Sequence, residues 1–127
     1  MEQPAGNKIT DNPSSHPALS VKWVEDFPDI PLNRNEAYKL RVTSKGVEIE
    51  AITETGVYRA IQTLRQLTEK KGNGIAITGC EITDWPAFRI RGFMQDVGRT
   101  YISTDELKRE IAILARYKIN VFHWHLT

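Results

Sequence analysis

The sequence predicts a mixed α/β fold in which a small β-sheet segment with one helix precedes a strand–helix–strand unit. Three observations carry this prediction: alternating apolar residues over 38–52, a helical apolar stripe over 55–71, and a strand–helix–strand order over 88–126. With 127 residues, the chain is long enough to bury a hydrophobic core. Its 40% hydrophobic and 26% charged residues are typical of a globular protein.

Composition excludes several classes of partner and site. The 17 basic and 16 acidic residues give a net charge of +1, which is too balanced to attract nucleic acid or anionic lipid by charge alone. No stretch approaches the roughly 18 apolar residues of a membrane span, and no secretory signal is visible at the N-terminus, so the sequence assigns no compartment. The single cysteine, Cys80, excludes an internal disulfide and a thiolate zinc site, and we interpret it as a small, partly buried residue.

The N-terminal third has little regular patterning. Residues 1–20 are rich in Pro, Gly, Asn and Ser, which predicts a disordered tail. The apolar run at residues 21–24 predicts a short edge strand, and the two prolines between residues 26 and 35 indicate a loop.

Apolar and polar residues then alternate on both sides of a turn at Lys45 and Gly46. This period of two is typical of half-buried strands, so the segment predicts a β-hairpin. The apolar positions are Tyr38, Leu40, Val42, Val47, Ile49 and Ala51.

A helix is expected next, over residues 55–71. Val57, Ile61 and Leu64 recur at helical spacing, and Lys70 and Lys71 suit the negative end of the helix dipole. Gly72 is expected to supply a left-handed cap, and residues 74–77 a further short strand.

The last third predicts a βαβ unit with parallel strands. Residues 88–97 and 119–126 have strand composition, and Ser103 with Glu106 forms a capping box for a helix that ends near Lys118. The second strand has no successor to pair with before Thr127, so we expect the chain to be a fragment of a larger α/β architecture.

Two groups of residues could carry chemistry. His123 and His125 alternate on one strand, so they share a face and could chelate a metal, or they could be hydrogen-bonded residues lining a sheet. Asp96 and Arg99 follow the first strand of the βαβ unit, where function gathers in parallel folds. Arg99 could donate to paired hydroxyls or a carboxylate, or it could form an ion pair with Asp96, and the spacing favours neither. Arg89 and Arg91 lie at the opposite end, where a stabilising role is expected.

Three motifs resemble the opening of the catalytic barrel of glycoside hydrolase family 20, the β-N-acetylhexosaminidases. They are Asp84-Trp85-Pro86, the run Arg91-Gly92-Phe93-Met94-Gln95-Asp96-Val97-Gly98-Arg99, and the run Lys118-Ile119-Asn120-Val121-Phe122-His123-Trp124-His125-Leu126. Upstream, residues 36–40 and 56–67 resemble the small α/β domain that precedes this barrel.

The resemblance implies an α/β (α+β) fold class. Residues 21–83 would be part of the family's N-terminal α/β domain, with its earlier strands missing. Residues 84–127 would be the first strand, helix and strand of a (β/α)8 TIM barrel, truncated at Thr127. Two departures stand out: Ala87 replaces a usual arginine, and Thr100 replaces a common histidine.

The resemblance also implies a function. Family members release terminal N-acetyl-hexosamine residues with retention by substrate assistance, using an Asp–Glu pair that would lie beyond Thr127. Arg99 would be a substrate-binding residue, with Asp96, His123 and His125 as its supporting residues. No catalytic residue, metal or cofactor is implied for this chain, and family members usually work outside the cytoplasm or in lysosomes.

The leading hypothesis is therefore a β-N-acetylhexosaminidase fragment that is inactive alone and takes an amino-sugar glycan in the complete enzyme. A non-catalytic carbohydrate-associated or assembly module is the alternative, and a metal-dependent hydrolase using His123 and His125 is a third. We also expect self-association through the truncated barrel edge.

Overall fold

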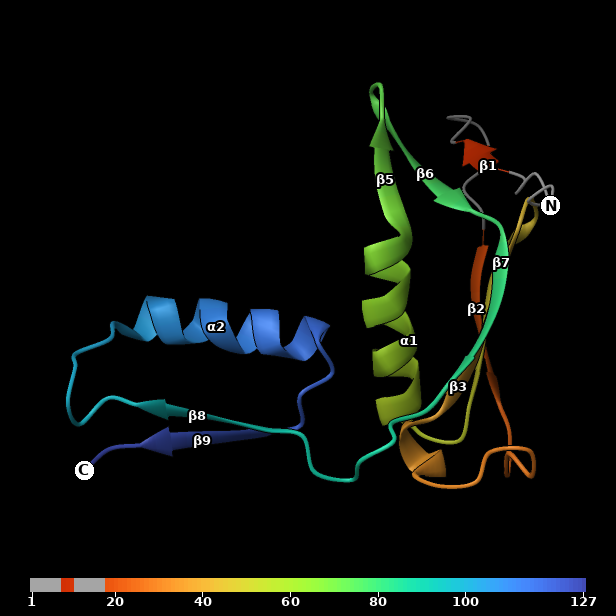
Figure 1. Ribbon diagram of the computed structural model, residues 1–127. Coiled ribbons are helices and arrows are strands. Elements are labelled where there is room, and N and C mark those ends of the chain that lie inside the picture. Colours follow the sequence, from red (N-terminus) through yellow and green to blue (C-terminus); the bar gives the residue numbers. More distant parts are fainter. Residues whose placement is uncertain (1–7, 11–17) are drawn as a thin grey trace, which may run out of the picture. The chain divides into compact units, whose positions relative to one another are not determined.

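The computed structural model describes residues 8–10 and 18–127 (Figure 1). The chain divides into two compact units, the first ending at Ala87 and the second spanning Phe88–Thr127. The sequence predicts a division after residue 83, whereas the first unit extends further because the strand that ends at Asp84 pairs within it. Within the described residues, no helix is long and apolar enough to cross a membrane.

The first unit is built on a four-stranded mixed sheet in the order β2-β4-β3-β7. The predicted hairpin is confirmed: β3 and β4 pair antiparallel, with Leu40 opposite Ile49. β2 runs parallel to β4 at one edge, and β7 pairs antiparallel with β3 at the other. The strands are β2 (Ala18–Trp23), β3 (Tyr38–Thr43), β4 (Gly46–Ala51) and β7 (Cys80–Asp84).

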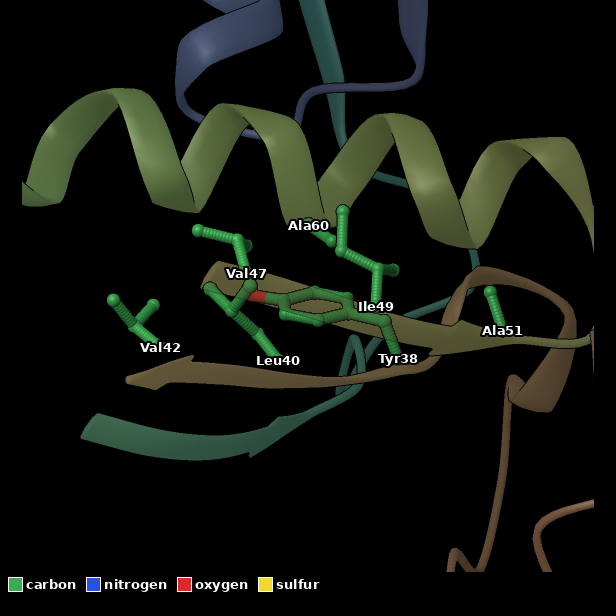
Figure 2. Packing of buried hydrophobic residues seen from close by; sticks show 7 residues of the cluster. All are labelled: Tyr38, Leu40, Val42, Val47, Ile49, Ala51 and Ala60. Carbon is green, nitrogen blue, oxygen red and sulfur yellow. The ribbon is translucent and has the colours of Figure 1, made fainter. Parts of the chain in front are cut away.

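Helix α1 (Glu54–Leu67) covers one face of this sheet, and the core lies between the two layers (Figure 2). The alternation of β3 and β4 sends every second side chain toward the helix, which is why those positions are buried. Full burial of each large aliphatic side chain contributes about 1.5–3 kcal/mol. The buried cluster is Tyr38, Leu40, Val42, Val47, Ile49, Ala51 and Ala60.

The N-terminal end of α1 packs closely against the segment before β3. The Thr53 hydroxyl accepts a hydrogen bond from the Gly56 amide, which caps the helix. A Cβ on Gly56 would lie 2.5 Å from the Ala37 carbonyl oxygen, so this approach requires glycine. Arg59 on α1 also pairs with Glu36 of the short 3-10 helix η1 (Arg34–Glu36), with Nη2 and Oε2 2.9 Å apart.

The expected extension of α1 to Lys71 is wrong. The helix ends at Leu67, and Thr68–Lys71 forms strand β5, which pairs antiparallel with β6 (Gly74–Thr78). Gly72, with φ of 61°, makes the turn between these strands rather than the helix cap. The reason is a competition for backbone hydrogen bonds: residues 68–71 obtain partners from β6, which a window of helix-forming residues does not reveal.

The structure also differs from the expected tail over residues 1–20. Strand β1 (Lys8–Thr10) pairs with β6, and β2 begins at Ala18, where it pairs with Gly46. A Cβ on Gly46, which has φ of 150°, would lie 2.5 Å from the Ala18 carbonyl oxygen, so a glycine lets the two strands meet. Residues 1–7 and 11–17 of the expected tail lie outside the described residues.

The second unit is the predicted βαβ unit. Strands β8 (Gly92–Asp96) and β9 (Val121–His125) are parallel, with Phe93 opposite Phe122, and α2 (Thr104–Arg116) connects them. Both strands are shorter than expected. The capping box is confirmed: the Ser103 hydroxyl accepts from the Glu106 amide, and the Glu106 carboxylate accepts from the Ser103 amide.

Helix α2 ends at Arg116, and Lys118, two residues further on, is left-handed with φ of 60°. Its amide donates to the Ala115 carbonyl, and the Ile119 amide donates to the Leu114 carbonyl. This pair of hydrogen bonds defines a Schellman motif, in which the left-handed position is usually glycine. The lysine therefore carries a conformational cost at this position.

Candidate functional site

The carboxyl ends of β8 and β9 form one edge of the second unit because the two strands are parallel. Asp96, the last residue of β8, is in register with His125, the last residue of β9. The amide of Val97 continues the pairing by donating to the His125 carbonyl over 2.9 Å. The structure thus brings the two predicted groups, Asp96–Arg99 and His123–His125, to the same edge.

Asp96 organises the turn that follows β8. Its Oδ1 accepts a hydrogen bond from the Gly98 amide over 3.0 Å, and its Oδ2 pairs with Nη1 of Arg99. Gly98 is tightly placed, because a Cβ there would lie 3.0 Å from the carbonyl carbon of Thr127 and 3.3 Å from the Leu126 oxygen. A larger residue at position 98 would therefore press on the end of β9.

The guanidinium of Arg99 contacts Asp96 through one terminal nitrogen, and most of the side chain is exposed. The side chain is 78% exposed, whereas that of Asp96 is 24% exposed. The sequence left an ion pair and a ligand-binding role open, and the structure shows the ion pair. This contact uses Nη1, and a guanidinium has five N–H donors in a planar fork. The arrangement can present a pre-oriented arginine to hydroxyl or carboxylate oxygens.

The two histidines lie on one face of β9, as their spacing predicts. Their ring centroids are 5.8 Å apart in an edge-to-face arrangement. In the part of the chain that the structure describes, no group of three or more His, Cys, Asp or Glu residues could hold a metal ion. The geometry therefore supplies two neighbouring imidazoles beside Asp96.

The opposite end of the strand pair is organised by residues that bind backbone. Arg91 donates from Nε to the Lys118 carbonyl and from Nη1 to the Phe88 carbonyl, each over 2.7 Å. Asn120 accepts from the Arg91 amide and donates to the Arg89 carbonyl, each over 2.8 Å. Arg91 thus contacts the backbone at this end, where the sequence predicts a stabilising role. The part played by Asn120 was missed, and its position directly before a strand was the only signal.

Charges on the exposed face of the four-stranded sheet pair across strands instead of converging on a site. Nζ of Lys22 lies 2.6 Å from Oε1 of Glu50, and this hydrogen bond and opposite charge raise the pKa of Lys22. Arg41 faces Glu81 over 2.9 Å. Opposite charges on neighbouring strands are the expected pattern of a solvated sheet face.

Cys80 packs against the core cluster of the first unit, and burial raises the pKa of its thiol. A raised pKa keeps the thiol protonated and unreactive at neutral pH. These surroundings agree with the interpretation of Cys80 as a small, partly buried residue.

Comparison with known proteins assigns both units to one family. The family model described as Glycosyl hydrolase family 20, domain 2, matches residues 3–85, and the model described as Glycosyl hydrolase family 20, catalytic domain, matches residues 88–127. The chain belongs to glycosyl hydrolase family 20. The expectation that residues 1–20 are a tail outside the family domain is wrong, because the first match begins at residue 3.

Family 20 relatives are similar along nearly the whole chain. A protein of Porphyromonas gingivalis named beta-hexosaminidase is 41% identical and is aligned with 99% of this chain, which covers 15% of the relative. A beta-N-acetylhexosaminidase of Cellulomonas fimi is 40% identical over 87% of this chain, which covers 22% of it. The chain thus spans about a fifth or less of these relatives' lengths.

Solved family 20 structures share the fold. The beta-N-acetylhexosaminidase of Bacteroides fragilis is 37% identical with a TM-score of 0.75, covering 86% of this chain and 21% of that protein. An exo beta-N-acetylglucosaminidase of Vibrio harveyi, solved in complex with N-acetylglucosamine, is 37% identical with a TM-score of 0.72 and covers 86% of this chain and 16% of that protein. The resemblance drawn from the three sequence motifs is confirmed at the level of the family.

Proposed function

We propose that residues 88–127 form the first strand, helix and second strand of a family 20 (β/α)8 barrel, and that the barrel hydrolyses terminal N-acetyl-hexosamine residues. The observation that carries this proposal is the position of Arg99. Its exposed guanidinium stands at the carboxyl ends of two parallel strands, which is the end where barrel enzymes place their sites. Residues 3–85 would be part of the α/β domain that precedes the barrel.

The chemistry proposed is retaining and substrate-assisted. The acetamido oxygen of the sugar attacks the anomeric carbon while a glutamic acid protonates the departing glycosidic oxygen, and an aspartate orients the acetamido group. Water then attacks the same carbon, breaks its bond to the acetamido oxygen and gives up a proton to the glutamate, so two inversions amount to retention. This Asp–Glu pair is expected beyond Thr127. Within this chain, Arg99 would donate to hydroxyls of the terminal sugar.

The relatives support the substrate class. The similar proteins named above are beta-hexosaminidases, and the Vibrio harveyi enzyme was solved with N-acetylglucosamine. His123 and His125 would line the site beside Asp96 without touching the reacting atoms.

A chromogenic N-acetylglucosaminide tests the proposal with two proteins, residues 1–127 alone and a complete barrel carrying this segment. We expect no turnover by residues 1–127, because loss of the general acid alone costs about 10²–10⁴-fold and the unassembled site loses positioning as well. The complete barrel should release the β-anomer first, as followed by NMR.

Two results would contradict the proposal. One is turnover that co-purifies with residues 1–127. The other is equal hydrolysis by the complete barrel of a glucoside that lacks the acetamido group, since substrate assistance requires that group.

A further inference from the structure

We propose that Asp96 is a positioning residue, whose carboxylate fixes the direction in which Arg99 presents its guanidinium at the carboxyl end of β8. The inference deepens the proposed function and rests on it where it concerns the sugar. Asp96 itself would not touch the sugar and would act through Arg99.

The two carboxylate oxygens of Asp96 have different partners. Oδ1 accepts from the Gly98 amide over 3.0 Å, and Oδ2 pairs with Arg99. One oxygen therefore shapes the backbone that carries Arg99, and the other holds its side chain. Both ends of a long flexible side chain are restrained by one neighbour, which removes rotamer freedom before any ligand arrives.

The residue that carries this carboxylate is itself held in place by strand pairing. Asp96 is the last residue of β8 and is paired in register with His125, and its side chain is only 24% exposed. The backbone beyond it is fixed by the Val97 amide, which donates to the His125 carbonyl over 2.9 Å. Gly98 then lies closely against Leu126 and Thr127, where a Cβ would make tight contacts of 3.0–3.3 Å. Arg99 is thus oriented from a rigid strand end.

A second arginine–carboxylate pair, Arg41 and Glu81, lacks these features. Arg41 and Glu81 also form an arginine–carboxylate contact, over 2.9 Å, but both side chains are more than half exposed and Glu81 lies within β7 on a solvated face. That pair supplies a matched control of the same chemistry without the positioning role.

The structural arm of the test uses residues 1–127 and NMR. Asp96→Asn keeps an oxygen for the Gly98 amide but removes the charge that holds Arg99, whereas Asp96→Ala removes both. We expect Asp96→Asn to increase the mobility of the Arg99 Nε–H group, with Glu81→Gln leaving it unchanged. Unchanged Arg99 mobility in both Asp96 variants would overturn the proposal.

The kinetic arm uses the complete barrel and a double-mutant cycle. Asp96→Asn should lower kcat/KM about tenfold, because misdirecting a binding group weakens positioning without removing it. In an Arg99→Ala background the same substitution should have no further effect, since a residue that acts only through Arg99 has nothing left to orient. The melting temperature should change as little as in Glu81→Gln.

A full additional loss in the Arg99→Ala background would show that Asp96 acts independently and would overturn the proposal. A complete barrel without activity would contradict the proposed function instead. The NMR arm would still decide whether Asp96 orients Arg99.

Discussion

The hydroxyl of Tyr38 donates a hydrogen bond to Oδ2 of Asp84 over 2.8 Å, and the Thr63 hydroxyl lies 2.6 Å from the same phenolic oxygen. Tyr38 is 1% exposed, and the three residues belong to β3, β7 and α1. The aspartate that opens the Asp84-Trp85-Pro86 motif therefore has a structural partner in the core of the first unit.

Replacing Tyr38 by Phe tests this contact. We expect the free energy of unfolding to fall by about 1.5–3 kcal/mol, because a buried hydrogen bond to a carboxylate is lost while the ring remains. Urea unfolding followed by circular dichroism measures the change. Tyr58→Phe, at a residue 45% exposed on α1, is the control and should be near neutral. Equal effects of the two substitutions would contradict the structural role.

Arg99 gives the prediction that concerns activity. In a complete barrel, Arg99→Lys should be nearly as harmful as Arg99→Ala, because an ammonium cannot reproduce the planar fork of donors. Loss of one charged hydrogen bond costs about 1.5–3 kcal/mol, so kcat/KM should fall about 10- to 100-fold. Steady-state kinetics and melting temperatures should be measured together. Normal kinetics with a much lower melting temperature would show that the ion pair with Asp96 is purely structural.

The capping box predicts a pH dependence. The Ser103 hydroxyl and amide donate to the Glu106 carboxylate over 2.6 Å and 3.0 Å, which lowers the pKa of Glu106. A lowered pKa in the folded state means that the contact stabilises α2 above the ordinary pKa of glutamate and is lost as pH falls through the lowered value.

Ser103→Ala should raise the pKa of Glu106 toward its ordinary value, as read by NMR titration. It should also cost about 0.5–2 kcal/mol at neutral pH, and less in acid. Ser44→Ala, in the exposed turn of the β3–β4 hairpin, is the control. An unmoved Glu106 titration would count against the capping box as the cause.

Lys118 predicts a stabilising substitution. Because it occupies the left-handed position of the Schellman motif, Lys118→Gly should raise the free energy of unfolding by about 0.5–1 kcal/mol. Asn33 also has a left-handed φ, of 50°, but its side chain donates to the Pro86 carbonyl over 2.7 Å. Asn33→Gly should therefore fail to stabilise. Thermal unfolding of both variants makes the comparison, and a gain only for Asn33→Gly would refute the reasoning.

The strand pair of the second unit predicts self-association. Among the described strands, β8 and β9 pair only with each other, so each keeps one open edge. Met94, Trp124 and Leu126 are 57%, 52% and 61% exposed. Residues 1–127 should form a concentration-dependent dimer by light scattering, weakened by Leu126→Lys but not by Ile75→Lys on β6. A clean monomer at high concentration would contradict this.

Local features of this protein follow from the sequence alone. The Ser103–Glu106 capping box needs only side chains and amides three residues apart, and the β3–β4 hairpin needs only alternation on both sides of a short turn. Both structures form from hydrogen bonds between near neighbours, so residue types at fixed spacing are sufficient to predict them. The position of Arg99 after a strand follows in the same way.

Other features depend on partners distant in the chain. Residues 68–71 are expected to continue the helix but form β5, because β6 supplies backbone partners. Residues 80–84 likewise form strand β7 by pairing with β3, which is about 40 residues earlier in the chain. Spacing could not choose between a free Arg99 and an Arg99 held by Asp96, since a separation of three residues is compatible with both, and the structure shows the ion pair. Sequence fixes which hydrogen bonds are locally available, and only the tertiary structure decides which of the competing distant partners is taken.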